Sequence, residues 1–425
     1  MNSGGGNSKT IEDLDNNMLA QILFRFPSGK FVVGCKLVSK RWCSLISDPK
    51  FASQFSNYKK EITTYSESSP IIDDGEPPWT FIANITYVID RQQYCWGNVS
   101  INEAMFGTPQ FSIGFLPYAF VIEATFKDLV LCSEKEISRI DQVYFITNPL
   151  TKQWVALPPC PVFSKSWVGL VCQEPCDYTQ DYKFRVVVID QCPPPVYDLM
   201  VYCSEIGEWK KFNLRVSIMP ELAAQKHHFN DSEFEGVVCN GIIYLLQRLY
   251  FAAFNPFDVD ETTSATTIEA KALPSFPYPI NGYLRESSGQ LFIIHNPNKD
   301  HYVCYQKHGR VINFPFIAWK LDPNQVPLIW KMTFDGSCTG NANKIESSCG
   351  KNLVYDMSVS TLGMHPKNDK LIYMHLHPEE QLVSCDTRTR LIKPLKSLQD
   401  YRLETFHRLE LQWWPTPVPK AYLSE

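Results

Sequence analysis

The stretch NPLTKQW, residues 148–154, follows an apolar run and places a polar turn before a tryptophan. The stretch CSEIGEW, residues 203–209, repeats this arrangement 55 residues later. CDTRTRL, residues 385–391, has the same turn with leucine for tryptophan, and FNPF, residues 254–257, matches its first half. Repeats of this size built from β-hairpins are typical of propellers, whose four-stranded blades take roughly 40–50 residues each.

The sequence around these turns has the composition of β-strands. FKDLVLC, FRVVVID, DLMVYCS and QLFIIHN are short runs rich in branched and aromatic residues. In GVVCNGIIYLL, residues 236–246, two apolar runs flank Asn240-Gly241, a pair that suits the positive φ angles of a type I′ turn. We therefore expect a hairpin there, within a mainly β, propeller-like domain over residues 80–412 that would hold about six to eight blades.

The repeat also predicts a shared packing position. Trp154 and Trp209 each open a strand, where neighbouring blades meet face to face and leave a wedge to fill. We expect both tryptophans to be mostly buried and structurally equivalent, with Leu391 buried at the matching position near the C-terminus. The alternative is that they are unrelated surface tryptophans in an irregular α+β domain.

Residues 11–56, which precede the β region, have helical periodicity instead. Residues 1–10 are polar and are expected to be a disordered tail. Asp15 can cap a first helix, Pro27 ends it, and Ser28 can cap a short second helix through Val33. The apolar side of the first helix is formed by Leu14, Met18, Leu19, Ile22, Leu23 and Phe26.

A third helix is predicted from about Lys36 to Asp48-Pro49. Its apolar stripe is Val38, Trp42, Leu45 and Ile46, and Trp42 should pack with Leu14, Ile22 and Val38. Its basic residues, Lys36, Lys40 and Arg41, lie mostly off this stripe and are expected to stay solvated. A helical unit this small has too little interior to be stable alone, so it should bury apolar residues against the rest of the chain or a partner.

Two further segments leave alternatives open. Residues 57–79 contain SESSPIIDDGEPP and are read as a linker, or else as a long loop of the next domain. Trp413 and Trp414 begin an expected C-terminal tail, residues 413–425. They either pack against the closing blade, which we favour, or form an exposed aromatic patch for a partner.

Composition narrows the class of protein. The 425 residues include 40 Lys+Arg and 45 Asp+Glu, a net charge of -5 that argues against nucleic-acid binding. The N-terminus lacks an apolar signal segment and no apolar run approaches the roughly 18 residues of a membrane span. We therefore expect 14 free cysteines, no membrane association, and a cytoplasmic or nuclear location.

No catalytic or cofactor motif is found. The nucleophile elbow and the phosphate-binding loop are both missing. Cys172 and Cys176 lack a second pair at zinc spacing, and His365, His375 and His377 are more typical of strand residues than of ligands. We expect no catalytic residue, no metal and no cofactor.

Residues 11–51, IEDLDNNMLAQILFRFPSGKFVVGCKLVSKRWCSLISDPKF, resemble an F-box. The family pattern has an Ile-Leu pair, a proline after the first helix, Val-x-Lys-x-Trp, and Leu-Ile before Asp-Pro; Asp15 and Phe26 depart from its usual proline and leucine. The resemblance implies a three-helix F-box over residues 11–56 that docks on a Skp-type adaptor of a cullin–RING ubiquitin ligase. The adaptor-binding residues would be Leu14, Leu19, Ile22, Leu23, Pro27, Val38, Trp42 and Leu45.

The β region is similar to the kelch-like, F-box-associated domain of plant F-box proteins. The similarity is carried by VYFITNPLTKQWVALPP, VYCSEIGEWK, GVVCNGIIYLL, YLRESSGQLFII and LGMHPKNDKLIYM, in the family's order. The family's glycine before LVLC is replaced here by Lys127-Asp128. This resemblance implies a domain that binds a protein substrate, through residues that the sequence does not identify.

Together these resemblances imply a non-catalytic substrate-recognition subunit of an SCF-type E3 ubiquitin ligase. The alternative is a β-propeller enzyme, a hydrolase or cyclotransferase, with an N-terminal helical cap.

Overall fold

The structure is a computed structural model of the 425-residue chain. It describes residues 11–64, 79–89, 93–100, 115–116, 120–134, 141–161, 166–174, 181–190, 196–216, 235–247, 250–258, 267–272, 282–295, 303–306, 309–322, 329–341, 358–377, 381–397 and 401–420. The expected disordered tail, residues 1–10, lies outside these ranges.

The N-terminal unit is helical, as expected, but it has four α-helices where three were predicted. Asp15 caps the first, its side chain accepting a hydrogen bond from the Met18 amide at 2.7 Å. The helical elements are the 3₁₀ turn η1 (Ile11–Asp13), α1 (Asn16–Phe24), α2 (Gly29–Gly34), the 3₁₀ turn η2 (Cys35–Leu37), α3 (Lys40–Ile46) and α4 (Pro49–Thr64).

Two boundaries of this unit differ from the prediction. The third helix begins at Lys40 and not near Lys36, because the Ser39 side chain caps it by accepting from the Trp42 amide at 3.3 Å. Asp48-Pro49 starts a fourth helix, with Asp48 accepting from the Lys50 amide at 2.9 Å and proline at the first helical position, which it favours. The linker expected over residues 57–79 is therefore wrong for residues 57–64, which belong to α4.

Most of the strands form six antiparallel meanders within the described residues, numbered here as blades one to six. Blade one is β26 (Tyr401–Glu410), β1 (Trp79–Ile89) and β2 (Gln93–Ser100); blade two is β3 (Phe120–Phe126), β4 (Leu129–Glu134), β6 (Tyr144–Asn148) and β7 (Gln153–Ala156). Blade three is β9 (Ser166–Cys172), β10 (Phe184–Asp190), β11 (Val196–Cys203) and β12 (Glu208–Val216); blade four is β13 (Glu235–Cys239), β14 (Ile242–Gln247), β15 (Tyr250–Phe254) and β16 (Thr267–Ala272). Blade five is β17 (Gly282–Ser287), β18 (Gln290–His295), β20 (Gly309–Asp322) and β21 (Ile329–Asn341); blade six is β22 (Ser358–Met364), β23 (Leu371–His377), β24 (Gln381–Asp386) and β25 (Leu391–Ser397).

Three short strands lie outside the meanders. β5 (Asp141–Gln142) pairs with β8 (Cys160–Pro161), and β19 (Val303–Gln306) pairs with β20. Parallel pairing of outer strands, β12 with β16 and β21 with β25, joins blades three to four and five to six.

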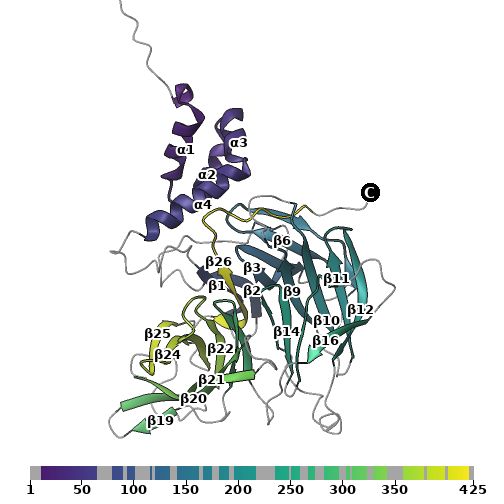
Figure 1. Ribbon diagram of the computed structural model, residues 1–425. Helices are drawn as coiled ribbons and strands as arrows, with labels where there is room; N and C mark the ends of the chain where they lie inside the picture. The colour runs from purple at the N-terminus through teal and green to yellow at the C-terminus, as the bar shows by residue number, and fades with distance from the viewer. Residues whose placement is uncertain are drawn as a thin grey trace, which may run out of the picture.

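The ring is closed by the last strand of the chain. β26 pairs antiparallel with β1, with Trp79 opposite Glu410 and Ala83 opposite Phe406. β26 also contacts β3 of blade two, and Phe81 of β1 packs with Leu362 of blade six in one apolar cluster. Figure 1 shows the blades side by side, with the four helices gathered at one end. The expected mainly β, propeller-like fold is confirmed.

Local geometry confirms the predicted turns. Asn240 and Gly241 have φ angles of 50° and 76° and connect β13 to β14 in a hairpin. The two tryptophan turns share one register, because Asn148 pairs with Gln153 as Cys203 pairs with Glu208. The C-terminal turn has Asp386 opposite Leu391. The structural equivalent of Trp154 and Trp209 is therefore Ile392, one residue after the predicted Leu391.

The expected burial holds only in part. Trp209 is half-buried between blades two and three, with its ring 5.7 Å from that of Tyr144, and its indole donates to the Pro158 carbonyl at 2.7 Å. Trp154 is 43% exposed and meets Phe145 of its own blade, so its predicted burial is wrong. Leu391 is 48% exposed, whereas Ile392 is 6% exposed. The prediction missed the alternation of faces along β25, which turns adjacent residues to opposite sides.

This register generates a paired stability prediction. Ile392→Ala should lower the free energy of unfolding by about 2–5 kcal/mol, because it removes buried methyl groups from the core of blades five and six. Leu391→Ala should change it by about 0.5 kcal/mol or less, since that side chain is largely solvated. Denaturant unfolding of both variants measures the difference, and the reverse order would contradict the register described here.

Candidate functional site

The helical unit exposes a group of large apolar side chains. Leu37 is 93% exposed, which is extreme for a leucine. We define the apolar helical surface as Ile11, Met18, Ile22, Phe31, Leu37 and Val38. Exposed apolar groups concentrated on one small unit are candidates for contact with another protein.

Arg41 connects two helices of this unit. Its Nε donates to Asn16 Oδ1 at 3.0 Å, and its guanidinium also donates to the Leu14 carbonyl. These bonds tie the start of α3 to the start of α1. Of the three basic residues expected to stay solvated, Lys40 is exposed, whereas Lys36 and Arg41 are half-buried.

The predicted adaptor-binding residues separate into three groups. Leu19, Leu23 and Trp42 are buried in the helical core. Leu14 and Leu45 are half-buried, and Ile22, Pro27 and Val38 are exposed.

Trp42 is buried as predicted, but its expected cluster with Leu14, Ile22 and Val38 is wrong, because none of the three belongs to the apolar cluster that contains Trp42. The side chains packed in its cluster come from α1, α2, α4 and the C-terminal segment. The reason is the Ser39 cap, which shifts the start of α3 and leaves Val38 outside its stripe.

Periodicity also missed three members of the exposed surface: Ile11, Phe31 and Leu37. They lie in η1, α2 and η2, elements of three to six residues. Elements this short show too few turns for a sequence pattern to reveal which side is exposed.

Trp414 belongs to the core of the helical unit. It is buried there, with ring centroids 5.7 Å from Phe51 and 5.6 Å from Phe55. The Gly29 amide donates to the Trp413 carbonyl at 3.0 Å, and a Cβ on Gly29 would lie 2.5 Å from that oxygen. The tail expected over residues 413–425 is thus wrong for 413–420, and Trp414 packs on the helices and not on the closing blade.

The residues that follow Trp414 are held by the propeller. The Thr416 amide donates to Asp128 Oδ2 at 3.0 Å, and Asn148 Nδ2 donates to the Thr416 carbonyl at 2.8 Å. Tyr182 donates to the Pro417 carbonyl at 2.8 Å, and Val418 enters the core of blades two and three. Residues 411–420, the connecting segment, therefore attach the helices to the propeller (Figure 1).

Asp128 is the buried centre of this attachment. It follows Lys127, whose φ of 52° is a conformation that glycine adopts more readily. Burial raises the pKa of Asp128 from 3.8 to about 6, although hydrogen bonds from Thr416 and Asn148 oppose this shift. We therefore expect the carboxyl to change its protonation state near pH 6.

A cavity of about 1250 Å³ occupies the centre of the propeller. It is lined by the inner strands of the blades: β26, β3, β9, β13, β17 and β22. Its charged lining residues are Glu123, Lys127, Glu174, Glu235, Arg285, Glu286, Arg408 and Glu410. His407 also lines it, and burial lowers the pKa of this imidazole to about 4.

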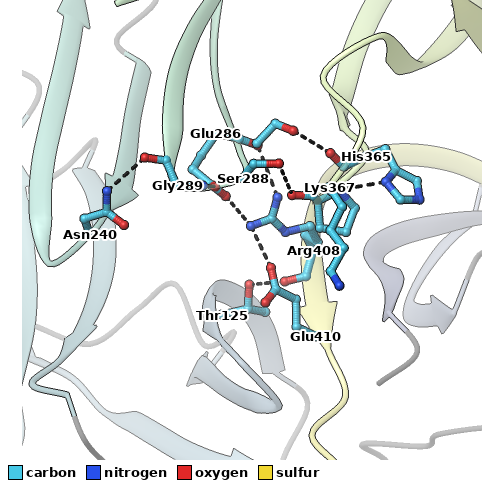
Figure 2. A network of polar contacts seen from close by, with 11 residues as sticks. Thr125, Asn240, Glu286, Ser288, Gly289, His365, Lys367, Arg408 and Glu410 are labelled. Atoms are coloured by element: carbon cyan, nitrogen blue, oxygen red, sulfur yellow. Dashed lines mark hydrogen bonds and ion pairs between the residues drawn. The ribbon is translucent and has the colours of Figure 1, made fainter. Parts of the chain in front are cut away.

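A polar network joins the blades at the end of the cavity nearest the helices. Arg408 forms ion pairs with Glu286 and, at 2.7 Å, with Glu410 (Figure 2). Thr125 donates to the Arg408 carbonyl at 2.6 Å, and the side chain of Asn240 donates to the Gly289 carbonyl at 2.8 Å. Residues far apart in sequence thereby meet across the ring.

Within the described ranges, no group of His, Cys, Asp or Glu residues is arranged to hold a metal ion. Cys172 and His375 are buried, and Cys176 and the side chain of His377 lie outside the described residues. His365 accepts hydrogen bonds from the Lys367 and Asn368 amides. Nine of the cysteines within the described ranges are free thiols. Among the described helices, none is both long and apolar enough to cross a lipid bilayer.

Comparison with known proteins identifies relatives of the propeller. Residues 117–259 match a family model described as F-box protein At3g26010-like, beta-propeller. The chain is 26% identical over 214 residues to F-box protein At3g26010 from Arabidopsis thaliana. That alignment covers 48% of this chain and 44% of the relative, so the chain spans less than half the length of the relative it matches.

Solved structures with distant similarity include a chain of the nidogen–laminin complex and the β-propeller domain of the Trilobed protease from Pyrococcus furiosus. The first has a TM-score of 0.39 at 9% identity and covers 79% of this chain and 100% of that chain. The second has a TM-score of 0.34 at 11% identity and covers 74% of this chain and 81% of that chain.

The role of Trp414 can be measured against another tryptophan. Trp414→Ala should destabilise the helical unit by about 3–5 kcal/mol, because it leaves a cavity beside Phe51 and Phe55. Trp154→Ala, the same change at a largely exposed position, should cost about 1 kcal/mol or less. Hydrogen exchange of α1 and α4 reports the helical unit directly. Equal protection of these helices in the two variants would contradict this assignment.

The buried Asp128 predicts a pH dependence. The folded protein holds the carboxyl proton up to about pH 6, whereas an unfolded aspartate releases it near 3.8, so this group's contribution to stability falls as pH rises between these values. Asp128→Asn keeps the shape and cannot titrate. Its stability relative to wild type should therefore increase from pH 4 to pH 7 by an amount on the order of 3 kcal/mol.

Thermal unfolding of the variant and of the wild type across this pH range measures that difference. His407 is present in both proteins, so its contribution cancels. Asp181→Asn, at an exposed aspartate that pairs with Lys420, is the control and should show little pH-dependent difference. A flat difference for Asp128→Asn would mean that the carboxyl is ionised throughout.

Proposed function

We propose that this protein is the substrate-recognition subunit of an SCF-type ubiquitin ligase. The apolar helical surface would bind a Skp-type adaptor, and the propeller would bind the protein to be ubiquitylated. The F-box pattern of residues 11–51, the propeller match to an F-box protein family and the similarity to an Arabidopsis F-box protein all support this proposal.

The observation that carries the proposal is the exposure of Phe31, Leu37 and Val38 on a helical unit that is already anchored. Trp414 of the connecting segment already packs in the core of that unit, and Phe31, Leu37 and Val38 remain exposed with this contact made. An apolar helix surface of this kind suits a partner with an apolar groove.

The position of the helices suggests where the substrate would bind. The connecting segment leads to the end of the propeller that carries the turns at 127–128, 240–241 and 288–289. The inner strands β9, β13, β17 and β22 begin at the opposite end, because each blade from β3 onward has an even number of meander strands. Substrate bound at that end would leave the helical end free for the adaptor.

In this role the chain performs no chemistry. It would raise the effective concentration of the substrate near the ubiquitin-carrying enzyme. The alternative of a propeller hydrolase that uses carboxylates usually requires a pair of them to be free. Four of the five cavity glutamates, Glu174, Glu235, Glu286 and Glu410, instead form ion pairs with Lys127, Arg285 or Arg408. Glu123 alone among the carboxylates of the described lining residues would be left for acid–base chemistry, which favours the receptor.

Charge substitutions on the apolar helical surface test the proposal. Leu37→Asp and Phe31→Asp should each weaken binding to a purified Skp-type adaptor by at least about thirtyfold, because a central apolar contact is worth about 2 kcal/mol or more. The thermal unfolding midpoint should stay unchanged, since both side chains are exposed.

Met332→Asp is the matched control, because Met332 is an exposed apolar residue of β21 on the propeller. It should leave adaptor affinity unaltered. The proposal fails if wild-type protein does not bind the adaptor, or if both helical variants bind it as wild type does.

A further inference from the structure

The central cavity is large enough for a segment of polypeptide. Its volume of about 1250 Å³ exceeds the roughly 300–1,000 Å³ of pockets that take small molecules. Side chains from every inner strand line it, so a ligand there would contact all six blades.

The lining carries more acidic than basic groups. Five glutamates face three basic residues, and every one of the three bases has an ion-pair partner within the cavity. Lys127 pairs with Glu174 at 3.2 Å and Arg285 with Glu235 at 3.0 Å. Arg408 is shared by two glutamates. The cavity therefore has surplus negative charge and no described base left to receive an anion.

Glu123 is the acid without a basic partner. It lies on β3 and accepts a hydrogen bond from the hydroxyl of Ser133. Burial raises the pKa of Glu123, and the Ser133 bond only partly offsets this effect. Its side chain nevertheless keeps accessible surface and lines the cavity, so a cation entering the cavity could reach it.

An aromatic surface lies on the neighbouring inner strands. The indole of Trp167 on β9 rests over Gly169 and Gly236, where an added Cβ would come within 2.4 Å of the ring. Its Nε1 donates to the Gly236 carbonyl at 3.1 Å, which holds the ring across β9 and β13. Two glycines thus make room for a fixed indole in the cavity wall.

A carboxylate without a basic partner and a fixed indole are the groups that bind cationic side chains, through charge and through cation–π attraction. We infer that the central cavity binds a basic segment of the substrate protein, with Glu123 and Trp167 contacting its arginine or lysine side chains. This inference rests on the proposed function, because it names the class of substrate that the propeller would receive.

Peptide binding to the full-length chain tests the inference. The probe is a fluorescently labelled Gly-Ser peptide carrying several arginines, measured by fluorescence polarisation beside counterparts with citrulline or glutamate. Citrulline has nearly the shape of arginine and no charge. The arginine peptide should bind at least about tenfold more tightly than the citrulline peptide, and the glutamate peptide should bind most weakly.

Two variants locate the binding in the cavity. Glu123→Gln and Trp167→Leu should each weaken binding of the arginine peptide by about three- to tenfold. Glu208→Gln removes the same charge from an exposed position on β12 and should change affinity by less than about twofold. Trp154→Leu is the matching control for the aromatic change.

Several results would overturn the inference. They are the absence of binding by the arginine peptide, equal binding of the citrulline peptide, and equal losses in Glu208→Gln and Glu123→Gln. Equal losses in these two variants would mean that the peptide is attracted only by the net charge of the whole protein, -5. Adaptor binding, measured on the same preparations, reports the proposed function separately, because the adaptor would contact the helices and not the cavity.

Discussion

The structure depends on one insertion, that of Trp414 into the helical core. A unit the size of residues 11–64 has little interior of its own, and the indole supplies a large apolar side chain between Phe51 and Phe55. Two residues later, the backbone of Thr416 is bound by Asp128 and Asn148 in blade two. The contacts to the helical core and to the propeller are therefore only two residues apart along the connecting segment.

The same C-terminal region also closes the ring. β26 supplies the inner strand of blade one by pairing with β1, and the connecting segment continues from its end. Closure of the propeller and attachment of the helices are therefore coupled. Arg408 strengthens this arrangement, because its side chain extends from β26 and forms an ion pair with Glu286 of blade five across the cavity (Figure 2).

This architecture separates two kinds of surface. The helical end presents exposed apolar side chains such as Leu37, whereas the cavity presents charge and the indole of Trp167. An apolar surface and an acidic cavity favour different partners, as the proposed receptor function requires.

The sequence by itself determined the β class, the helical N-terminal unit, the Asn240-Gly241 hairpin and the repeated turn, because these depend on local periodicity and on the φ angles that particular residues adopt. It also placed Trp42 in a buried core. It could not show that Ser39 caps α3 and leaves Val38 exposed, or that Ile392 and not Leu391 corresponds to Trp209. Only the tertiary structure decided the partners of Trp414, the six-membered arrangement of the blades and the cavity with Glu123 and Trp167. Those features depend on contacts between residues as far apart as Gly29 and Trp413. The local periodicity of one segment does not indicate which distant segment will pack against it.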